Sequence, residues 1–214
     1  LYRMFSVFLD PNFAGAFFVL FFLFLLNLIF ENLKSKDKLI IYSLLSALTL
    51  IAILLTYSRS SFVMLVFGVF LFLVIKKRVK YIVVIILALA ALTLVLPKAY
   101  KTEGTNFFRT ASSEARLGSY SQGFSIFKES PIYGVGFNAY RFAKSRNADI
   151  AAKPNLNSHA DSSNDNSFLF VLATTGLIGF SIFVFMWYKI LQKYKKSSLV
   201  IASICALFID SFFM

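Results

Sequence analysis

Arg59 and Arg116 are the first residues whose type could do chemistry, because arginine is well suited to bind phosphate. Arg59 stands in the short turn 57–61, which reads Tyr-Ser-Arg-Ser-Ser and separates two apolar runs. Its guanidinium could hold a phosphate through two parallel hydrogen bonds at any working pH, or could anchor the chain by reaching lipid headgroups. Arg116 opens a predicted amphipathic helix, where its charge opposes the helix macrodipole. It could be solvated, or could supply a second positive charge for an anionic headgroup.

Three ionisable residues, His159, Asp161 and Asp165, precede the apolar run that begins at Ser167. A carboxylate or imidazole at this place could take a proton from an attacking hydroxyl. Asp165 could also cap the following helix by accepting an N–H from its first turn, and the two roles are compatible. The spacing of the three residues matches no standard metal site, so we predict no metal.

Two pairs of glycines mark further places of interest. Gly134 and Gly136 precede a predicted short helix and could turn backbone N–H groups toward an anion, although a tight turn after Pro131 explains them more simply. Gly176 and Gly179 lie about one helical turn apart in an apolar run. Small residues on one helix face allow a neighbouring helix to approach closely, so this pair predicts helix packing rather than chemistry.

The composition is typical of a membrane protein. Of the 214 residues, 58% are hydrophobic, 27 are Phe and only 15% are charged, whereas a soluble domain needs more charge to cover its surface. The formal charge of +12 does not indicate nucleic acid, because most basic residues cluster between apolar runs. Cys205 is the single cysteine, so no intrachain disulfide can form. Asp210 lies in an apolar run, where an ionisable residue is functional by default, but its role is open.

The apolar runs predict an all-α polytopic membrane protein with about six transmembrane helices. The six segments are 13–30, 39–57, 61–75, 81–96, 167–188 and 198–214. The first four form a predicted membrane region over 1–96, and the last two form another over 167–214. Because residue 1 is Leu and the last apolar run is unfinished, we expect the chain to be part of a longer protein.

Three short connections predict the orientation of these helices. The connections 31–38, 76–80 and 189–196 hold half of the Lys and Arg residues and fall on one side if all six segments span. The positive-inside rule makes that side cytoplasmic. The turn at Arg59 and the long connection 97–166 then lie on the outer, extracytoplasmic face.

The long connection 97–166 has helical segments of its own. Apolar residues at helical spacing predict an amphipathic helix over 113–129, and 137–146 can form a second, shorter helix. The stretch 147–166 is rich in Asn, Asp, Ser and Ala and is predicted to be irregular. Connections of this length inside a compact protein are usually functional.

Taken in order, three stretches resemble motifs of the bacterial O-antigen ligase and O-antigen polymerase family of membrane glycosyltransferases. The turn Thr-Tyr-Ser-Arg-Ser-Ser at 56–61 is similar to the family's Ser-Arg at the outer end of a helix. The run 115–137 is similar to its Arg-led loop helix followed by Pro-x-x-Gly-x-Gly. The most specific likeness is Asn166, nine residues, and then Gly-Leu-Ile-Gly-Phe at 176–180. Asp-Pro-Asn at 10–12 is also similar to the family's Asn-Pro-Asn.

The resemblance implies a GT-C-like fold whose outer loop lies over the active site. It implies an enzyme that moves a glycan from undecaprenyl pyrophosphate to a sugar hydroxyl, without metal or other cofactor, at the outer face of the bacterial cytoplasmic (inner) membrane. Arg59 and Arg116 would bind the pyrophosphate and act in catalysis, with Gly134, Gly136 and Asn166 as further substrate contacts. The implied partners are the lipid-linked donor, a glycan or lipid acceptor, membrane lipids and other polysaccharide-assembly proteins, with no nucleic acid.

One position departs from the family pattern. Asp165 stands where family ligases have a His that is thought to act as the base, and a carboxylate could play that role with a lower pKa. His159, six residues earlier, could compensate. The change favours a polymerase over a lipid A-core ligase of lipopolysaccharide assembly. The alternative is a transporter or flippase of lipid-linked glycans, although such proteins often carry mid-membrane charges and repeated halves.

Overall fold

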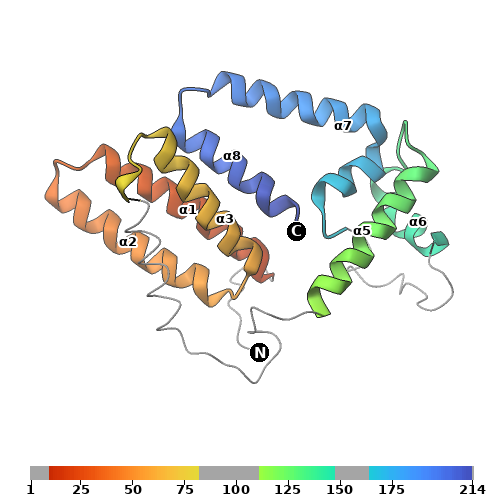
Figure 1. The fold of residues 1–214 in the computed structure, drawn as a ribbon, viewed down its shortest axis with the longest axis horizontal. Coiled ribbons are helices and arrows are strands. Elements are labelled where there is room, and N and C mark those ends of the chain that lie inside the picture. Colours follow the sequence, from red (N-terminus) through yellow and green to blue (C-terminus); the bar gives the residue numbers. More distant parts are fainter. Residues whose placement is uncertain (1–9, 82–110, 148–163, 214) are drawn as a thin grey trace. The chain divides into compact units, whose positions relative to one another are not determined.

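The computed structural model describes residues 10–81, 111–147 and 164–213 (Figure 1). Every regular element within these residues is helical, which confirms the predicted fold class in its all-α part. In chain order the helices are α1 (Pro11–Glu31), α2 (Lys36–Leu55), α3 (Arg59–Ile75), α5 (Ala111–Glu129), the 3-10 helix η3 (Phe137–Ala139), α6 (Tyr140–Asn147), α7 (Ser167–Lys193) and α8 (Ser198–Ser211).

The described residues belong to two compact units. Residues 10–81 and 194–210 form the first, which contains α1, α2, α3 and nearly all of α8. Residues 111–147, 164–193 and 211–213 form the second, which contains α5, η3, α6 and α7. Ser211, the last residue of α8, therefore belongs to the second unit, and the rest of that helix belongs to the first.

The first unit is built around α1, which packs against both α2 and α3. Asp10 begins α1 by accepting the N–H groups of Asn12 and Phe13, and Pro11 occupies the first helical position, where its missing N–H has no cost. On α3, a Cβ added at Gly68 would lie 3.1 Å from Ala206 of α8 and 3.1 Å from Leu23 of α1. The absence of a side chain at Gly68 thus lets three helices meet closely.

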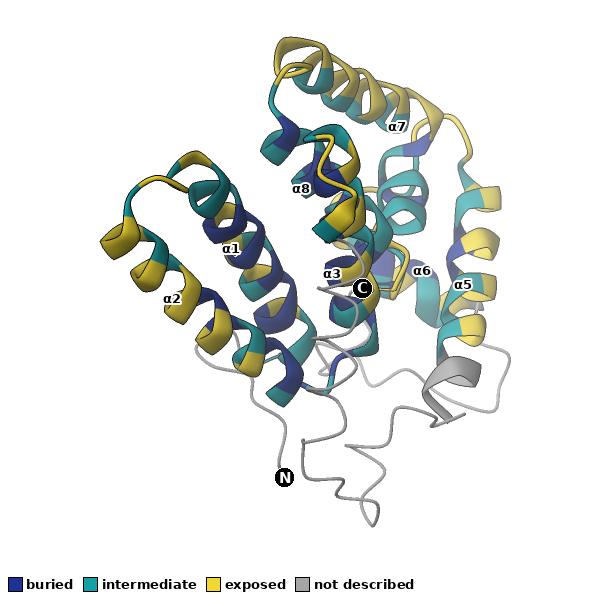
Figure 2. Cartoon of the chain, turned by 60° about the vertical axis from the view of Figure 1, so that its left-hand side comes forward, coloured by how far each residue is buried: buried dark blue, intermediate teal, exposed yellow. Residues whose placement is uncertain are grey.

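Apolar side chains cover the outside of this unit as well as its inside. Val19 and Leu23 of α1 are fully buried, yet Phe13 and Phe17 on the same helix are 58% and 51% exposed. Figure 2 shows the same contrast between the buried face of α1 and the exposed outer face of α2. A helix that is apolar on all sides needs an apolar surrounding, so these surfaces suit the hydrocarbon of a membrane.

Three of the described helices are long and apolar enough to cross a membrane, namely α1, α2 and α7, whereas α3 and α8 are shorter apolar helices. Five of the six predicted segments correspond to helices whose bounds differ from the prediction by a few residues. These segments are 13–30, 39–57, 61–75, 167–188 and 198–214. The predicted segment 81–96 lies almost wholly outside the described residues. The number of six spans therefore stays a prediction.

The second unit contains the helices that the sequence predicts within the long connection. The amphipathic helix over 113–129 is confirmed as α5, and the short helix over 137–146 is confirmed as η3 followed directly by α6. A small core of Ile126, Tyr140, Ala143 and Ala173 joins α5, α6 and α7, and Phe170 packs against it. Most of the stretch 147–166, predicted to be irregular, lies outside the described residues.

Helix α7 is broken at Gly176, which the sequence did not predict. Gly176 has φ 65° and ψ −170°, a backbone conformation that only glycine adopts readily. Figure 1 shows the change of direction between the two parts of the helix. The part after the break carries exposed apolar side chains such as Ile182 and Phe185, which are 65% and 58% exposed.

The break in α7 is joined to the loop after α5 by four backbone hydrogen bonds. Val135 and Gly136 donate to the carbonyls of Ala173 and Thr174 over 3.0 and 2.9 Å, and cap the end of the first part. Leu177 and Ile178 donate to the carbonyls of Pro131 and Ile132 over 2.9 and 3.3 Å, and begin the second part. The loop thus satisfies the backbone groups that the break exposes.

The glycines at this junction have a different role from the predicted packing of neighbouring helices. A Cβ added at Gly134 would lie 2.3 Å from the Thr174 carbonyl oxygen, and one at Gly176 would lie 2.3 Å from that of Ile132. A Cβ at Gly179 would meet Thr175 of the same helix at 2.3 Å. Gly134 and Gly176 therefore serve the break itself, where two backbone segments touch.

Candidate functional site

Arg116 lies on α5 one turn before Tyr120, so both side chains share a face of the helix. The Arg116 guanidinium carbon lies 5.9 Å from the centre of the Phe213 ring, a cation–π contact. The Tyr120 hydroxyl donates to the carbonyl of Phe212. The segment that follows α8 is thus fastened along the Arg116 face of α5. Among the described residues, no carboxylate forms an ion pair with Arg116.

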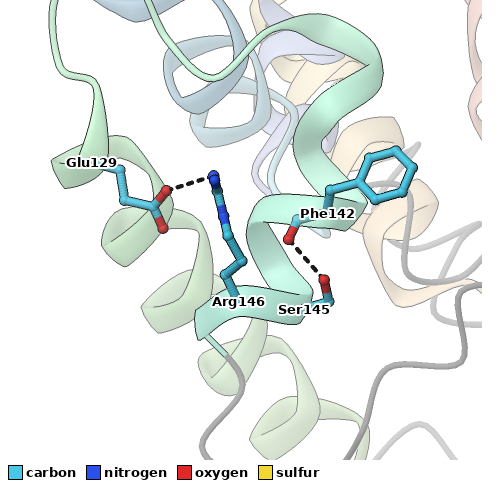
Figure 3. A network of polar contacts seen from close by, with 4 residues as sticks. All are labelled: Glu129, Phe142, Ser145 and Arg146. Carbon is cyan, nitrogen blue, oxygen red and sulfur yellow. Dashed lines mark hydrogen bonds and ion pairs between the residues drawn. The ribbon is translucent and has the colours of Figure 1, made fainter.

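Arg146 in the same unit provides a contrast with Arg116. Its Nη2 lies 3.0 Å from Oε2 of Glu129, so α6 and α5 are joined by an exposed ion pair (Figure 3). A surface pair of this kind contributes little to stability, and its arginine is already engaged. The guanidinium of Arg116 can therefore donate hydrogen bonds to a ligand, whereas the guanidinium of Arg146 already donates to Glu129.

Asp165 stands immediately before the residue that caps α7. The cap is Asn166, whose Oδ1 accepts the N–H of Leu169 over 3.0 Å. The prediction that Asp165 caps this helix is therefore wrong, since the amide one residue later takes that position. The Asp165 carboxylate is exposed and makes no hydrogen bond or ion pair within the parts of the chain that the structure describes. It remains available for chemistry.

The backbone around Asp165 is fastened to α5. The Asp165 N–H donates to the Ser119 hydroxyl over 3.2 Å, and the Asn166 N–H donates to Oδ1 of Asn164 over 2.9 Å. The side-chain amide of Asn164 donates to the Ser119 carbonyl over 2.6 Å and to the Tyr140 hydroxyl over 2.8 Å. Asp165 thus follows a firmly bound residue, although its own side chain faces solvent.

The pKa values of two tyrosines in this unit are raised by their surroundings. Burial raises the pKa of Tyr120, the Asp165 carboxylate raises it further, and Arg116 and Asn166 lower it. Burial also raises the pKa of Tyr140, where Asp165 adds to the effect and Asn164 opposes it. Both phenols are therefore protonated at neutral pH. Tyr120 lies within the electrostatic reach of a cation and of a carboxylate at once.

Arg59 belongs to the first unit and is the first residue of α3. The chain reaches it through Tyr57, a non-glycine residue with φ 49° in the left-handed region, where such residues are uncommon. Ser58 then caps α3 by accepting the Ser61 N–H over 3.3 Å. A tight turn between the two helices is confirmed, but it covers 56–58, because residues 59–61 of the predicted turn already belong to α3. Arg59 is therefore at a helix N-terminus, where the positive charge of its guanidinium adds to the partial positive charge of the helix end.

A cluster of buried hydroxyl groups lies at the start of α3, the helix that Arg59 begins. Ser58 donates to Oδ1 of Asn12 over 2.8 Å, and Ser61 donates to the Ser58 oxygen over 2.9 Å. Ser60 lies 3.1 Å from Ser58 and is 2% exposed. A Cβ added at Gly15 of α1 would meet the Ser61 oxygen at 2.2 Å. The two sequence motifs at 10–12 and 56–61, far apart in the chain, are thus packed against each other.

The remaining predicted residues have different outcomes. The N–H groups of Gly134, Val135 and Gly136 all donate to carbonyls of this chain, which favours the tight turn over an anion site. The side-chain oxygen of Asn166 caps α7 by accepting the N–H of Leu169.

His159 lies outside the described residues, as does Asp161. Asp210 in α8 is 1% exposed. The described residues contain no group of side chains that could hold a metal ion.

Sequence reasoning missed several polar residues that complete the two regions. Asn164 and Tyr140 are 6% and 1% exposed, yet nothing in the composition of their segments singles them out. The hydroxyl cluster left a clearer signal, since Thr56, Ser58, Ser60 and Ser61 crowd one junction between two apolar helices. Tyr120 is one of the residues whose helical spacing predicts the helix over 113–129, and that spacing gives no sign of a role for its hydroxyl.

Apolar helices with polar groups gathered at their ends define this chain as a helical membrane protein. The family model for O-antigen ligase matches residues 44–184, which is well over half of the sequence. The chain belongs to the O-antigen ligase family. This family indicates a glycosyltransferase-like enzyme of the bacterial inner membrane that acts on lipid-linked glycans. No significant match was found among curated proteins, and none among solved structures.

Proposed function

We propose that the protein transfers a glycan from undecaprenyl pyrophosphate to a sugar hydroxyl at the outer face of the inner membrane, without a metal. The observation that carries this proposal is the arrangement at α5, where Ser119 lies three residues after Arg116 and its hydroxyl accepts the N–H of Asp165 over 3.2 Å. The guanidinium suits a pyrophosphate, and the carboxylate suits the proton of an acceptor. Both groups are free of ion pairs within the described residues.

In the proposed reaction the acceptor oxygen attacks the anomeric carbon of the donor glycan from the face opposite the pyrophosphate. The bond from that carbon to the pyrophosphate oxygen breaks, and undecaprenyl pyrophosphate leaves with the electron pair. Asp165 takes the proton of the attacking hydroxyl, or His159 does so in its place. The configuration at the anomeric carbon is inverted because a single displacement occurs.

Arg59 and Arg116 are proposed to bind the pyrophosphate and to stabilise the negative charge that grows on it during bond breaking. Preorganised donors aimed at developing charge typically account for a factor of about 10²–10³ in rate each. Each arginine is supported within its own unit, Arg59 by the capped start of α3 and Arg116 by the Phe213 ring. Gly134 and Gly136 contribute by shaping the backbone, since their N–H groups are already engaged.

A polymerase is favoured over a lipid A-core ligase because Asp165 replaces the His of family ligases. The alternative of a transporter or flippase gains one observation, since broken helices are common at transporter substrate sites. Here, however, the loop 131–136 satisfies the backbone groups on both sides of the break at Gly176. That pairing leaves those groups unavailable to a substrate and favours the transferase.

The deciding experiment supplies purified full-length protein in proteoliposomes with a single lipid-linked repeat unit. A ladder of longer lipid-linked products supports a polymerase. Products that form only after lipid A-core is added indicate a ligase. Movement of the unmodified lipid across the bilayer, with no new glycosidic bond, would contradict the proposal and support the flippase.

A further inference from the structure

Asn164 lies at the centre of a buried hydrogen-bond network that the proposed reaction does not yet use. An asparagine side chain offers two N–H donors and one carbonyl acceptor. The two donors go to the Ser119 carbonyl at 2.6 Å and the Tyr140 hydroxyl at 2.8 Å, and the carbonyl accepts the Asn166 N–H at 2.9 Å. The residue is 6% exposed. A buried amide with all of its groups satisfied specifies one conformation, because any displacement leaves a polar group unpaired.

The three partners of Asn164 belong to three different elements. Ser119 is on α5, Tyr140 begins α6, and Asn166 is the cap of α7. A Cβ added at Gly123 of α5 would lie 2.6 Å from the Asn164 amide nitrogen, so α5 has no side chain where this amide enters. The amide therefore ties α5, α6 and the start of α7 together at a single point.

Asp165 is held on both sides by this arrangement. The residue before it is the buried amide, the residue after it is the cap of α7, and its own N–H donates to the Ser119 hydroxyl over 3.2 Å. Ser119 is also adjacent to Tyr120 and three residues beyond Arg116 on the same helix. The same short stretch of α5 therefore carries Arg116 and holds the backbone of Asp165.

We propose that Asn164 is a positioning residue for Asp165. It contacts no reacting atom; it fixes the backbone from which the Asp165 carboxylate reaches the acceptor hydroxyl, at a constant distance from Arg116. The inference rests on the proposed role of Asp165 as the base. A misplacement of about 1 Å can cost about a hundredfold in rate. The hydrogen bonds of Asn164 should therefore affect turnover more than donor binding.

The test measures donor binding and turnover separately in the full-length protein. Radiolabelled undecaprenyl-pyrophosphate-linked oligosaccharide gives the binding capacity and Kd, and product formation gives the turnover per bound donor. For Asn164→Ala we expect capacity and Kd within about twofold of wild type, and turnover lower by about tenfold to a hundredfold. Tyr140→Phe and Ser119→Ala, which keep the packing but each remove one hydroxyl, should show a smaller loss of the same kind.

Two further variants make the outcomes distinct. Asn138→Ala, at an exposed asparagine of η3, is the matched control and should behave as wild type. Asp165→Asn tests the base itself. If Asp165→Asn loses turnover while Asn164→Ala keeps it, the positioning role is wrong and the proposed function stands. If Asp165→Asn keeps full turnover, the base assignment fails and the positioning role fails with it. Loss of donor binding together with turnover in Asn164→Ala, Tyr140→Phe and Ser119→Ala alike would show a purely structural role.

Discussion

The surroundings of Arg59 and of Arg116 are built in opposite ways. Arg59 starts a helix directly after a tight turn, and a buried cluster of serine hydroxyl groups at the start of α3, bonded to Asn12 of α1, supports that turn. Arg116 lies on an amphipathic helix and is supported by Phe213, a residue almost a hundred positions later in the chain. The first region is preorganised by packed apolar helices, whereas the second depends on segments that come together from three parts of the sequence.

The two regions are therefore sensitive to different substitutions. A hydroxyl cluster inside packed helices fails when one of its buried hydrogen bonds is removed. A region assembled from distant segments fails when the junction that joins them is disturbed. The variants below test the two modes of failure, each with a matched control.

Gly176→Ala should have the largest effect, and it should act on the second region. An L-residue at φ 65° and ψ −170° is strained, and its Cβ would meet the Ile132 carbonyl oxygen at 2.3 Å. We expect a loss of about 3 kcal/mol or more in unfolding free energy, because neither backbone segment can move aside. Thermal unfolding of the purified full-length protein in detergent measures the change.

Gly118→Ala is the control for that variant. Gly118 lies within α5, and a Cβ there would have nothing within 4 Å. Replacing a glycine in a helix by alanine should stabilise the protein by about 0.5–1 kcal/mol. Equal thermal stability of the Gly118→Ala and Gly176→Ala variants would contradict the role assigned to the break in α7.

Ser58→Ala should have the next largest effect, and it should act on the first region. The Ser58 oxygen accepts the Ser61 N–H and the Ser61 hydroxyl, and it donates to Asn12. Its removal takes away both the helix cap and the centre of the cluster. We expect the unfolding free energy to fall by about 1–3 kcal/mol. Thermal unfolding should show this loss, together with weaker donor binding through Arg59. Ser43→Ala, at an exposed serine of α2, should change neither quantity.

Phe213→Leu should have a smaller effect that appears in binding rather than in stability. The ring supports the Arg116 guanidinium by a cation–π contact, which is worth about 0.5–1 kcal/mol at an exposed site. Donor Kd should therefore rise by about two- to fivefold. Phe213→Tyr keeps the aromatic face and should retain wild-type affinity. A Kd of Phe213→Leu equal to that of Phe213→Tyr would show that the ring does not support Arg116.

The sequence predicted the first region better than the second, for a physical reason. Apolar periodicity and turn residues are local signals, so the helices and the turn at Arg59 could be placed within a few residues. The break at Gly176 arises from hydrogen bonds to the loop 131–136, which lies far away in the sequence. The apolar residues before and after Gly176 keep a helical pattern, so the sequence predicts one continuous helix there.

The cap of α7 shows the same limit at the scale of one residue. Asp165 and Asn166 are both good capping residues, and sequence alone favoured the first. The structure assigns the cap to Asn166 because Asn164 accepts its N–H and the Ser119 hydroxyl accepts that of Asp165. Those partners fix the register of the turn, and Ser119 lies on another helix. These contacts make Asn166 the cap of α7 and leave the Asp165 carboxylate without a hydrogen bond among the described residues.

The most direct test of the account compares Arg116→Ala and Asp165→Asn with Arg146→Ala in the full-length protein, at equal amounts in the membrane. Arg146 is the control because it lies in the same unit and is already paired with Glu129 at 3.0 Å. We expect Arg116→Ala and Asp165→Asn each to lower glycan transfer by about a hundredfold or more, while Arg146→Ala stays within about twofold of wild type. Full transfer activity in the Arg116→Ala variant, or an equal loss in all three, would contradict the proposed function.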